Sequence, residues 1–180
     1  MVGADKIKAR EGIVSGLCAG GIFLLAQMAI SLFRGQPLSA PLHLIASVPL
    51  GLQAVSGRFS FPAVLLTAVI VQAALSALWG LVFAALVSLT EADGEGRARF
   101  ALNGMLFGLF VWLVDMRLIA PALFPQLRLM DGFWGGFLAY TFFFGLPLGL
   151  LYSLIAGARQ KPAYKEVHYG AYSGSYRSGV

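Results

Sequence analysis

Asp115 is the side chain in this sequence that is best placed to do chemistry, because it lies inside a long apolar run. The run extends from Phe100 to Phe124 and carries Arg117 two residues after the acid. A carboxylate within a membrane is costly, so such a residue marks proton transfer, ion binding or a buried ion pair. Asp115 falls about 22 Å along a helix that starts at Phe100, which predicts a position near the outer interface of the membrane.

A structural ion pair is the role that we predict for Asp115 at this depth. Residues two apart on a helix do not face each other, so Arg117 is a poor partner for the acid. Arg34 ends the first apolar run of the chain and is the partner that we expect. A proton relay through Asp115 is the alternative.

Two amide side chains give a second hypothesis. Gln27 and Gln72 lie within apolar runs, where amides usually hydrogen-bond across helices. Together with Asp115 they could instead line a narrow polar path, but no ring of charge accompanies them to form a filter. We therefore predict that the two amides hold helices together. Other polar residues that such a path could include are Ser76, Asn103 and Thr141.

Cofactor binding and catalysis find little support in the residue types present. His43 is a candidate haem or chlorophyll ligand, but membrane haems generally take two histidines, and His168 lies far along the chain near its end. Cys18 is the single cysteine, so an intrachain disulfide is excluded. The sequence also lacks the GxSxG, HExxH, P-loop and CxxC patterns of common enzymes and metal sites. We expect no enzyme activity, no metal and no cofactor.

The composition places these residues in a membrane. Hydrophobic residues make up 58% of the 180 residues and charged residues 12%, whereas soluble domains have about 25% charged residues. Four runs are long enough to cross the hydrocarbon core as helices. We predict an all-α, polytopic membrane protein of one domain, whose four transmembrane helices cover residues 12–33, 61–89, 100–120 and 133–156.

The segment between the first two predicted spans is too broken to cross the membrane. Pro37, Pro41 and Pro49 interrupt it, and irregular backbone exposed to lipid would leave amide groups unpaired. We predict a short interfacial or re-entrant helix over residues 41–55. In the fourth span, Pro147 predicts a kink.

Small residues recur at helical spacing in two of the spans. The first span carries Gly12, Gly16 and Gly20 on one face, and the third carries Gly104 and Gly108. Such rows let backbones approach closely, and we expect contacts within the chain rather than a dimer. Gly80 and Gly145 align in a weak internal repeat that would make the chain two similar hairpins.

The charges predict how the protein lies in the membrane. Most of the 13 Lys and Arg residues fall on the side of the two termini, which predicts that residues 1–11 and the Tyr/Gly/Ser tail 157–180 are cytoplasmic. The tail has the composition of a flexible segment. The net charge of +5 suits anionic lipid headgroups, so we expect the lipid bilayer as partner and no nucleic acid.

Several stretches carry a resemblance to known proteins. The segments PLHLIAS, LSALWGLVFAAL, GMLFGLFVWLVDMRLIAPALFP and TFFFGLPLGLLYSL resemble those of a group of small four-span bacterial inner-membrane proteins. The resemblance covers most of residues 12–156 and implies a four-helix fold in the bacterial inner membrane. That group has no assigned activity, so the resemblance transfers no functional residue, and the tail is a departure from it.

Two functions from different classes follow. The first function is an accessory or scaffold subunit that packs against a larger membrane complex. It is favoured by the absence of catalytic and metal-binding motifs, by the helix faces of small residues and by the tail. The alternative is a small oligomeric transporter or channel with a polar path past Gln27, Gln72 and Asp115. Either function implies a membrane-protein partner or a homo-oligomer.

Overall fold

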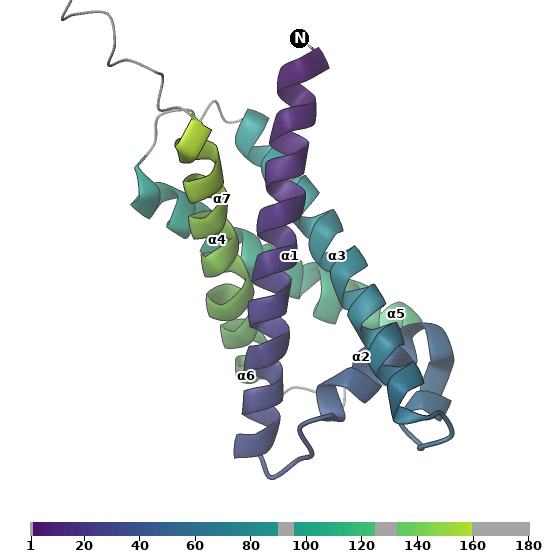
Figure 1. Cartoon of the computed structure of the whole chain (residues 1–180). Coiled ribbons are helices and arrows are strands. Elements are labelled where there is room, and N and C mark those ends of the chain that lie inside the picture. Colours follow the sequence, from purple (N-terminus) through teal and green to yellow (C-terminus); the bar gives the residue numbers. More distant parts are fainter. Residues whose placement is uncertain (1, 90–95, 125–132, 160–180) are drawn as a thin grey trace, which may run out of the picture.

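The computed structural model of the protein describes residues 2–89, 96–124 and 133–159 (Figure 1). Residues 160–180 of the predicted tail lie outside the described residues, as do the loop at 90–95 and the turn at 125–132. All regular structure in the described part is helical. The prediction of an all-α fold is therefore confirmed.

Four helical stretches are long and apolar enough to cross a membrane, as the sequence predicted. They are Ala9–Phe33, Phe61–Leu89, Arg97–Leu123 and Trp134–Ala156. Each is at least 23 residues long, whereas about 20 residues suffice to span the hydrocarbon. The chain is thus a multi-pass membrane protein. The start of α1 (Val2–Phe33) lies at the same end of the bundle as the end of α7 (Leu146–Arg159) (Figure 1).

The first hairpin consists of α1 (Val2–Phe33) and α3 (Phe61–Leu89). The chain leaves α1 through Gly35, whose φ of 69° is a left-handed conformation that glycine adopts at little cost. Pro62 stands in the first turn of α3, where its missing N–H breaks no helical hydrogen bond. Gly35 and Pro62 are therefore suited to the end of α1 and to the start of α3.

The predicted interfacial helix is also present between these two spans. It comprises α2 (Ala40–Leu50) and the short 3₁₀ turn η1 (Gly51–Ala54), close to the predicted range of 41–55. Its apolar face packs on the first half of α3, where Leu42 and Ala46 are buried against Val64. A helix this short does not cross the membrane, and it covers one end of the bundle (Figure 1).

The third and fourth spans each contain a widened, π-helical stretch. The third runs through α4 (Arg97–Trp112), η2 (Leu113–Ile119) and α5 (Ala120–Leu123). The fourth runs through α6 (Phe133–Leu138), η4 (Ala139–Gly145) and α7 (Leu146–Arg159). Both π-helical stretches, η2 and η4, end shortly before a proline, Pro121 or Pro147.

Glycine contacts hold each hairpin together. A Cβ atom placed on Gly16 would lie 2.8 Å from the Cα of Gly80, and one placed on Gly108 would lie 2.9 Å from the Cα of Gly145. Real Cβ atoms do not approach so closely, so the helices can meet here only because neither residue has a side chain. The predicted glycine faces are therefore packed inside the chain, and the glycines aligned in the repeat occupy matching places.

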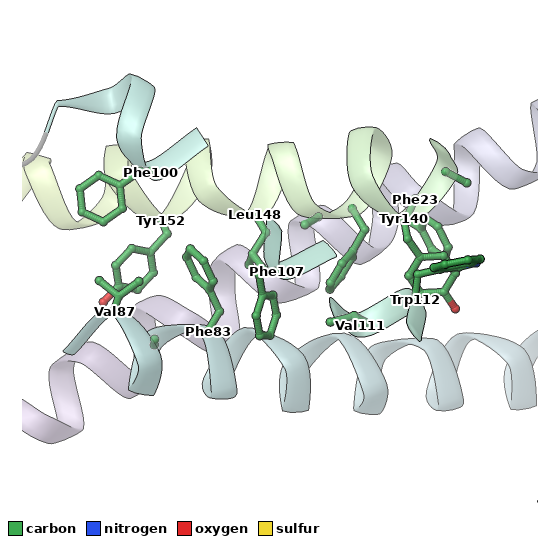
Figure 2. Packing of buried hydrophobic residues seen from close by; sticks show 14 residues of the cluster. Phe23, Phe83, Val87, Phe100, Phe107, Val111, Trp112, Tyr140, Leu148 and Tyr152 are labelled. Carbon is green, nitrogen blue, oxygen red and sulfur yellow. The ribbon is translucent and has the colours of Figure 1, made fainter. Parts of the chain in front are cut away.

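Aromatic side chains fill the space where the two hairpins meet. Figure 2 shows Phe83 between Tyr152 and Phe107, with Phe23 and Tyr140 farther along the same core. The ring centroids of Phe83 and Tyr152 are 5.5 Å apart with the rings perpendicular, an arrangement that aromatic pairs prefer. Small residues thus join helices within a hairpin, and large ones join the hairpins.

Candidate polar site in the membrane core

A small cavity between the helices brings several polar side chains together. Its volume is about 40 Å³, which has room for about two or three water molecules. All four spans contribute to its wall. The residues that line it are Phe23, Gln72, Leu75, Ser76, Trp79, Val111, Asp115, Tyr140 and Phe144.

Asp115 lies beside the central part of α3. It lines the cavity together with Gln72 and Trp79, which come from the central part of the 29-residue helix α3. The expected position near the outer interface assumed a straight α-helix normal to the membrane. The third span instead crosses behind α1 and α3 (Figure 1), and η2 widens it at this residue.

The indole of Trp79 is the neighbour that interacts with the Asp115 carboxylate. Its Nε1–H is buried and makes no hydrogen bond of good geometry, although it approaches the acid. Asp115 itself is partly buried. A carboxylate and an N–H donor that meet without a full hydrogen bond leave both groups able to bind a water molecule in the cavity.

Gln72 joins the two helices of the first hairpin. Its Nε2 donates to the carbonyl oxygen of Gly20 at 3.3 Å and to the Oγ of Ser76 at 3.3 Å. The absence of a side chain at Gly20 makes room for the Ser76 hydroxyl. The amide therefore does hold helices together, as predicted, and it also lines the cavity.

The fourth span contributes its π-helical stretch, η4, to the same region. Tyr140 and Phe144 line the cavity, and Tyr140 meets Phe23 of α1 edge to face with ring centroids 4.6 Å apart. The next residue, Thr141, is buried and its Oγ1 makes no hydrogen bond. Both π-helical stretches thus lie beside the cavity, and such stretches are frequent at functional sites.

The arginines named in the sequence analysis do not line the cavity. Arg34 is exposed at the end of α1, and Arg117 places its guanidinium 5.3 Å from the ring centre of Trp112. The ion pair of Asp115 with Arg34 stays a prediction. The acid shares the cavity wall with amide, hydroxyl and indole groups.

Only some of the residues predicted to form a polar path lie together in the structure. Gln72, Ser76 and Asp115 line one cavity. Gln27 is partly buried on α1 but is not among the lining residues. Asn103 lines a separate cleft on the side of the bundle.

His43 lies in α2, away from this cavity. Its Nδ1 is buried without a hydrogen bond, and its ring meets Phe61 edge to face at 6.4 Å. Within the residues that the structure describes, no cluster of three or more His, Cys, Asp or Glu side chains could hold a metal ion. The cofactor hypothesis for His43 gains no second ligand from the described part of the chain.

Trp79 and Tyr140 line the cavity with polar atoms, but neither was predicted as a site residue from the sequence. Trp79 stands far from either end of α3, which is unusual for a residue that normally anchors helices at the interface. That position was the available signal. Nothing in the sequence marks Tyr140 as a cavity residue, because its proximity to Asp115 depends on how the hairpins pack.

The chemistry open to this cavity follows from its size and its groups. A carboxylate, an amide and hydroxyls can exchange protons or bind water, but a volume of about 40 Å³ excludes an organic solute, whose sites are usually about 300–1,000 Å³.

The resemblance to small bacterial inner-membrane proteins stays a prediction. No protein-family model, no curated protein and no solved structure matches the chain.

Proposed function

We propose that this protein is a small membrane transport protein that moves protons, with Asp115 as the group that binds and releases them. The observation that carries the proposal is the small cavity that Asp115 lines together with Gln72, Ser76 and Trp79. Ionisable side chains at such depth are expensive and typically mark a proton or ion pathway. A cavity with room for a few water molecules suits proton transfer better than it suits a larger solute.

The alternative role as an accessory subunit has less support from the geometry. One motive for it was the glycine faces, but Gly16 and Gly80 pack against each other inside the chain. The same holds for Gly108 and Gly145. A second motive was the tail, whose residues 160–180 lie outside the described residues, and the third was the absence of known catalytic motifs, which a proton-binding carboxylate does not need. The transport hypothesis therefore becomes the preferred one.

The proposal includes a location in the bacterial inner membrane with both termini in the cytoplasm. Its support is the concentration of Lys and Arg on the side of the termini. The start of α1 and the end of α7 at one end of the bundle are consistent with it (Figure 1). A homo-oligomer or a membrane-protein partner belongs to the proposal as well.

Proton flux into liposomes tests the function directly. The purified protein is reconstituted with a pH-sensitive dye inside, and a potassium gradient with valinomycin supplies the membrane potential. We expect flux above that of protein-free liposomes, and a loss of about 100-fold or more in Asp115→Asn, because positioned proton-transfer groups contribute about 10²–10⁴-fold. Asp115→Glu should retain part of the flux, because it keeps the carboxylate.

Gln53→Leu is the control variant, because Gln53 is an exposed amide in η1. It should transport protons at the wild-type rate. Wild-type flux no higher than that of empty liposomes would refute the proposal, and so would full flux in a folded Asp115→Asn variant. Infrared difference spectra give an independent check, since the band of a protonated carboxylic acid should vanish in Asp115→Asn.

A further inference from the structure

A large cleft lies on the side of the bundle between α3 and α4, apart from the Asp115 cavity. Its volume is about 660 Å³, within the usual range for sites that hold an organic ligand. Leu86, Leu106 and Phe110 are exposed at its edges, so the cleft opens toward the surrounding membrane. Its lining consists of Phe83, Leu86, Val87, Arg99, Asn103, Leu106, Phe107 and Phe110.

The cleft exists because α3 and α4 are held by different partners. Gly80 draws α3 against α1, and Gly104 draws α4 against α7. Between α3 and α4 the contacts are instead between bulky rings, such as Phe83 with Phe107 at 5.3 Å and Trp79 with Phe110 at 6.3 Å. Large side chains keep the two helices apart, and the cleft is the groove that remains between them.

The polarity of the cleft changes along α4. Arg99 and Asn103 stand one helical turn apart near the start of α4, and the rest of the lining is apolar. From Arg99 to Phe110 the groove follows eleven residues, or about 16 Å of helix. That length is about half of a hydrocarbon core of roughly 30 Å, which is the depth of one leaflet.

From this arrangement we infer that the cleft binds one anionic phospholipid. The phosphate lies at Arg99 and Asn103, and an acyl chain follows Leu106, Phe107 and Phe110 toward the middle of the membrane. Basic residues in a pocket between transmembrane helices, near the membrane surface, are a recurring feature of sites for anionic lipid headgroups. The occupant comes from the leaflet on the side of the termini, because α4 starts at that end of the bundle (Figure 1).

Arg99 also has a contact within the protein, and lipid binding does not require that contact to break. A guanidinium carries five N–H donors in a fixed fork, so one group can serve an internal partner and a phosphate oxygen together. The site is independent of proton transport. Lipid binding can therefore fail or succeed without changing the outcome of the flux experiment.

Lipid retention measured by native mass spectrometry tests this inference. The full chain is stripped of lipid in detergent and mixed with equal amounts of dioleoyl phosphatidylglycerol and dioleoyl phosphatidylcholine. We expect one molecule of the anionic lipid to remain in preference to the zwitterionic one. Arg99→Gln should lower that retention about fivefold, in keeping with one basic side chain at a lipid headgroup.

Arg58→Gln is the matched control, because Arg58 is exposed before α3, at the opposite end of that helix from the cleft. It should leave retention of the anionic lipid unchanged. Leu106→Trp places bulk in the groove without touching the charge, and it should weaken retention of both lipids. If Arg99→Gln does not fold, Arg99→Lys and Leu106→Trp carry the test, with the preference for anionic lipid kept in the first and retention reduced in the second.

Three outcomes would overturn the inference. Equal retention of the two lipids by the wild type would show that charge plays no part. Equal losses in Arg99→Gln and Arg58→Gln would assign the effect to net charge instead of the cleft. Displacement of the lipid by soluble glycerol phosphate at similar concentration would show that the acyl chain contributes nothing and that the groove is not a lipid site.

Discussion

Pro121 and Pro147 stand in the same relation to a widened turn of helix. Each lies two residues after the last residue of a π-helical stretch, η2 or η4. The N–H of Ala120 donates to the carbonyl of Asp115, and the N–H of Leu146 donates to the carbonyl of Thr141. A proline ring clashes with the carbonyl four residues earlier in an α-helix, and the five-residue spacing relieves that clash.

Replacing Pro121 by alanine should therefore alter the site without unfolding the protein. In Pro121→Ala the new N–H can bond to the carbonyl of Arg117, which favours an α-helical turn over the π-helical one. The turn that contains Asp115 then shifts, and proton flux should fall several-fold while the midpoint of thermal unfolding stays the same or rises. Flux in proteoliposomes and thermal unfolding in detergent measure the two effects.

Pro62→Ala is the control for this change, because Pro62 stands in the first turn of α3. A proline at that position disturbs no helical hydrogen bond. Its replacement should leave both flux and unfolding unaltered. Wild-type flux in Pro121→Ala would mean that the π-helical stretch has no part in placing the acid.

The glycine contacts predict that alanine substitutions at Gly16 and Gly21 of α1 change stability in different ways. A Cβ on Gly16 would lie 2.8 Å from the Cα of Gly80, whereas one on Gly21 would have no atom within 4 Å. Gly16→Ala should destabilise the protein by about 1–3 kcal/mol, as overpacking does in tight cores. Gly21→Ala should be neutral or stabilising by up to about 1 kcal/mol, since alanine is the better helix former.

Unfolding in increasing fractions of a denaturing detergent measures this pair of variants. The two substitutions are the same in chemistry and five residues apart in one helix, so differences in helix propensity cancel. Equal midpoints for the two variants would contradict the packing of α1 on α3.

The sequence was informative about the elements and less so about how they meet. Hydrophobic runs and prolines predict the four spans and the helix at 41–55, because the bilayer fixes the length of an apolar helix. The glycine spacing of Gly12, Gly16 and Gly20 predicts a close backbone contact, but nothing in that spacing names Gly80 as the partner. Asp115 was selected from its chemistry alone. Its true neighbours were missed because the path of the third span depends on side chains from all four helices.

Gln72 allows the structural and transport roles of the cavity to be separated. Gln72→Leu removes the hydrogen bond to Gly20 of α1 and the one to Ser76 within α3. A hydrogen bond between membrane helices contributes about 0.6 kcal/mol on average. We expect a loss of about 1 kcal/mol in stability and a fall in proton flux, since the cavity loses a polar group. The matched substitution Gln53→Leu, at an exposed amide, should change neither. Lower stability with wild-type flux would assign Gln72 to helix packing alone.

A double-mutant cycle decides whether Asp115 is paired with Arg34. The acid lines a cavity with Gln72 and Trp79, and Arg34 is not among the residues of that wall. Removing each charge alone and then both, as Asp115→Asn and Arg34→Gln, should give effects on stability that add to within about 0.5 kcal/mol, because sites without contact are independent. Thermal or detergent unfolding of the three variants supplies the numbers. A coupling well above that value, with Arg34→Gln rescuing the stability of Asp115→Asn, would restore the ion pair and give the acid a structural role in place of proton transfer.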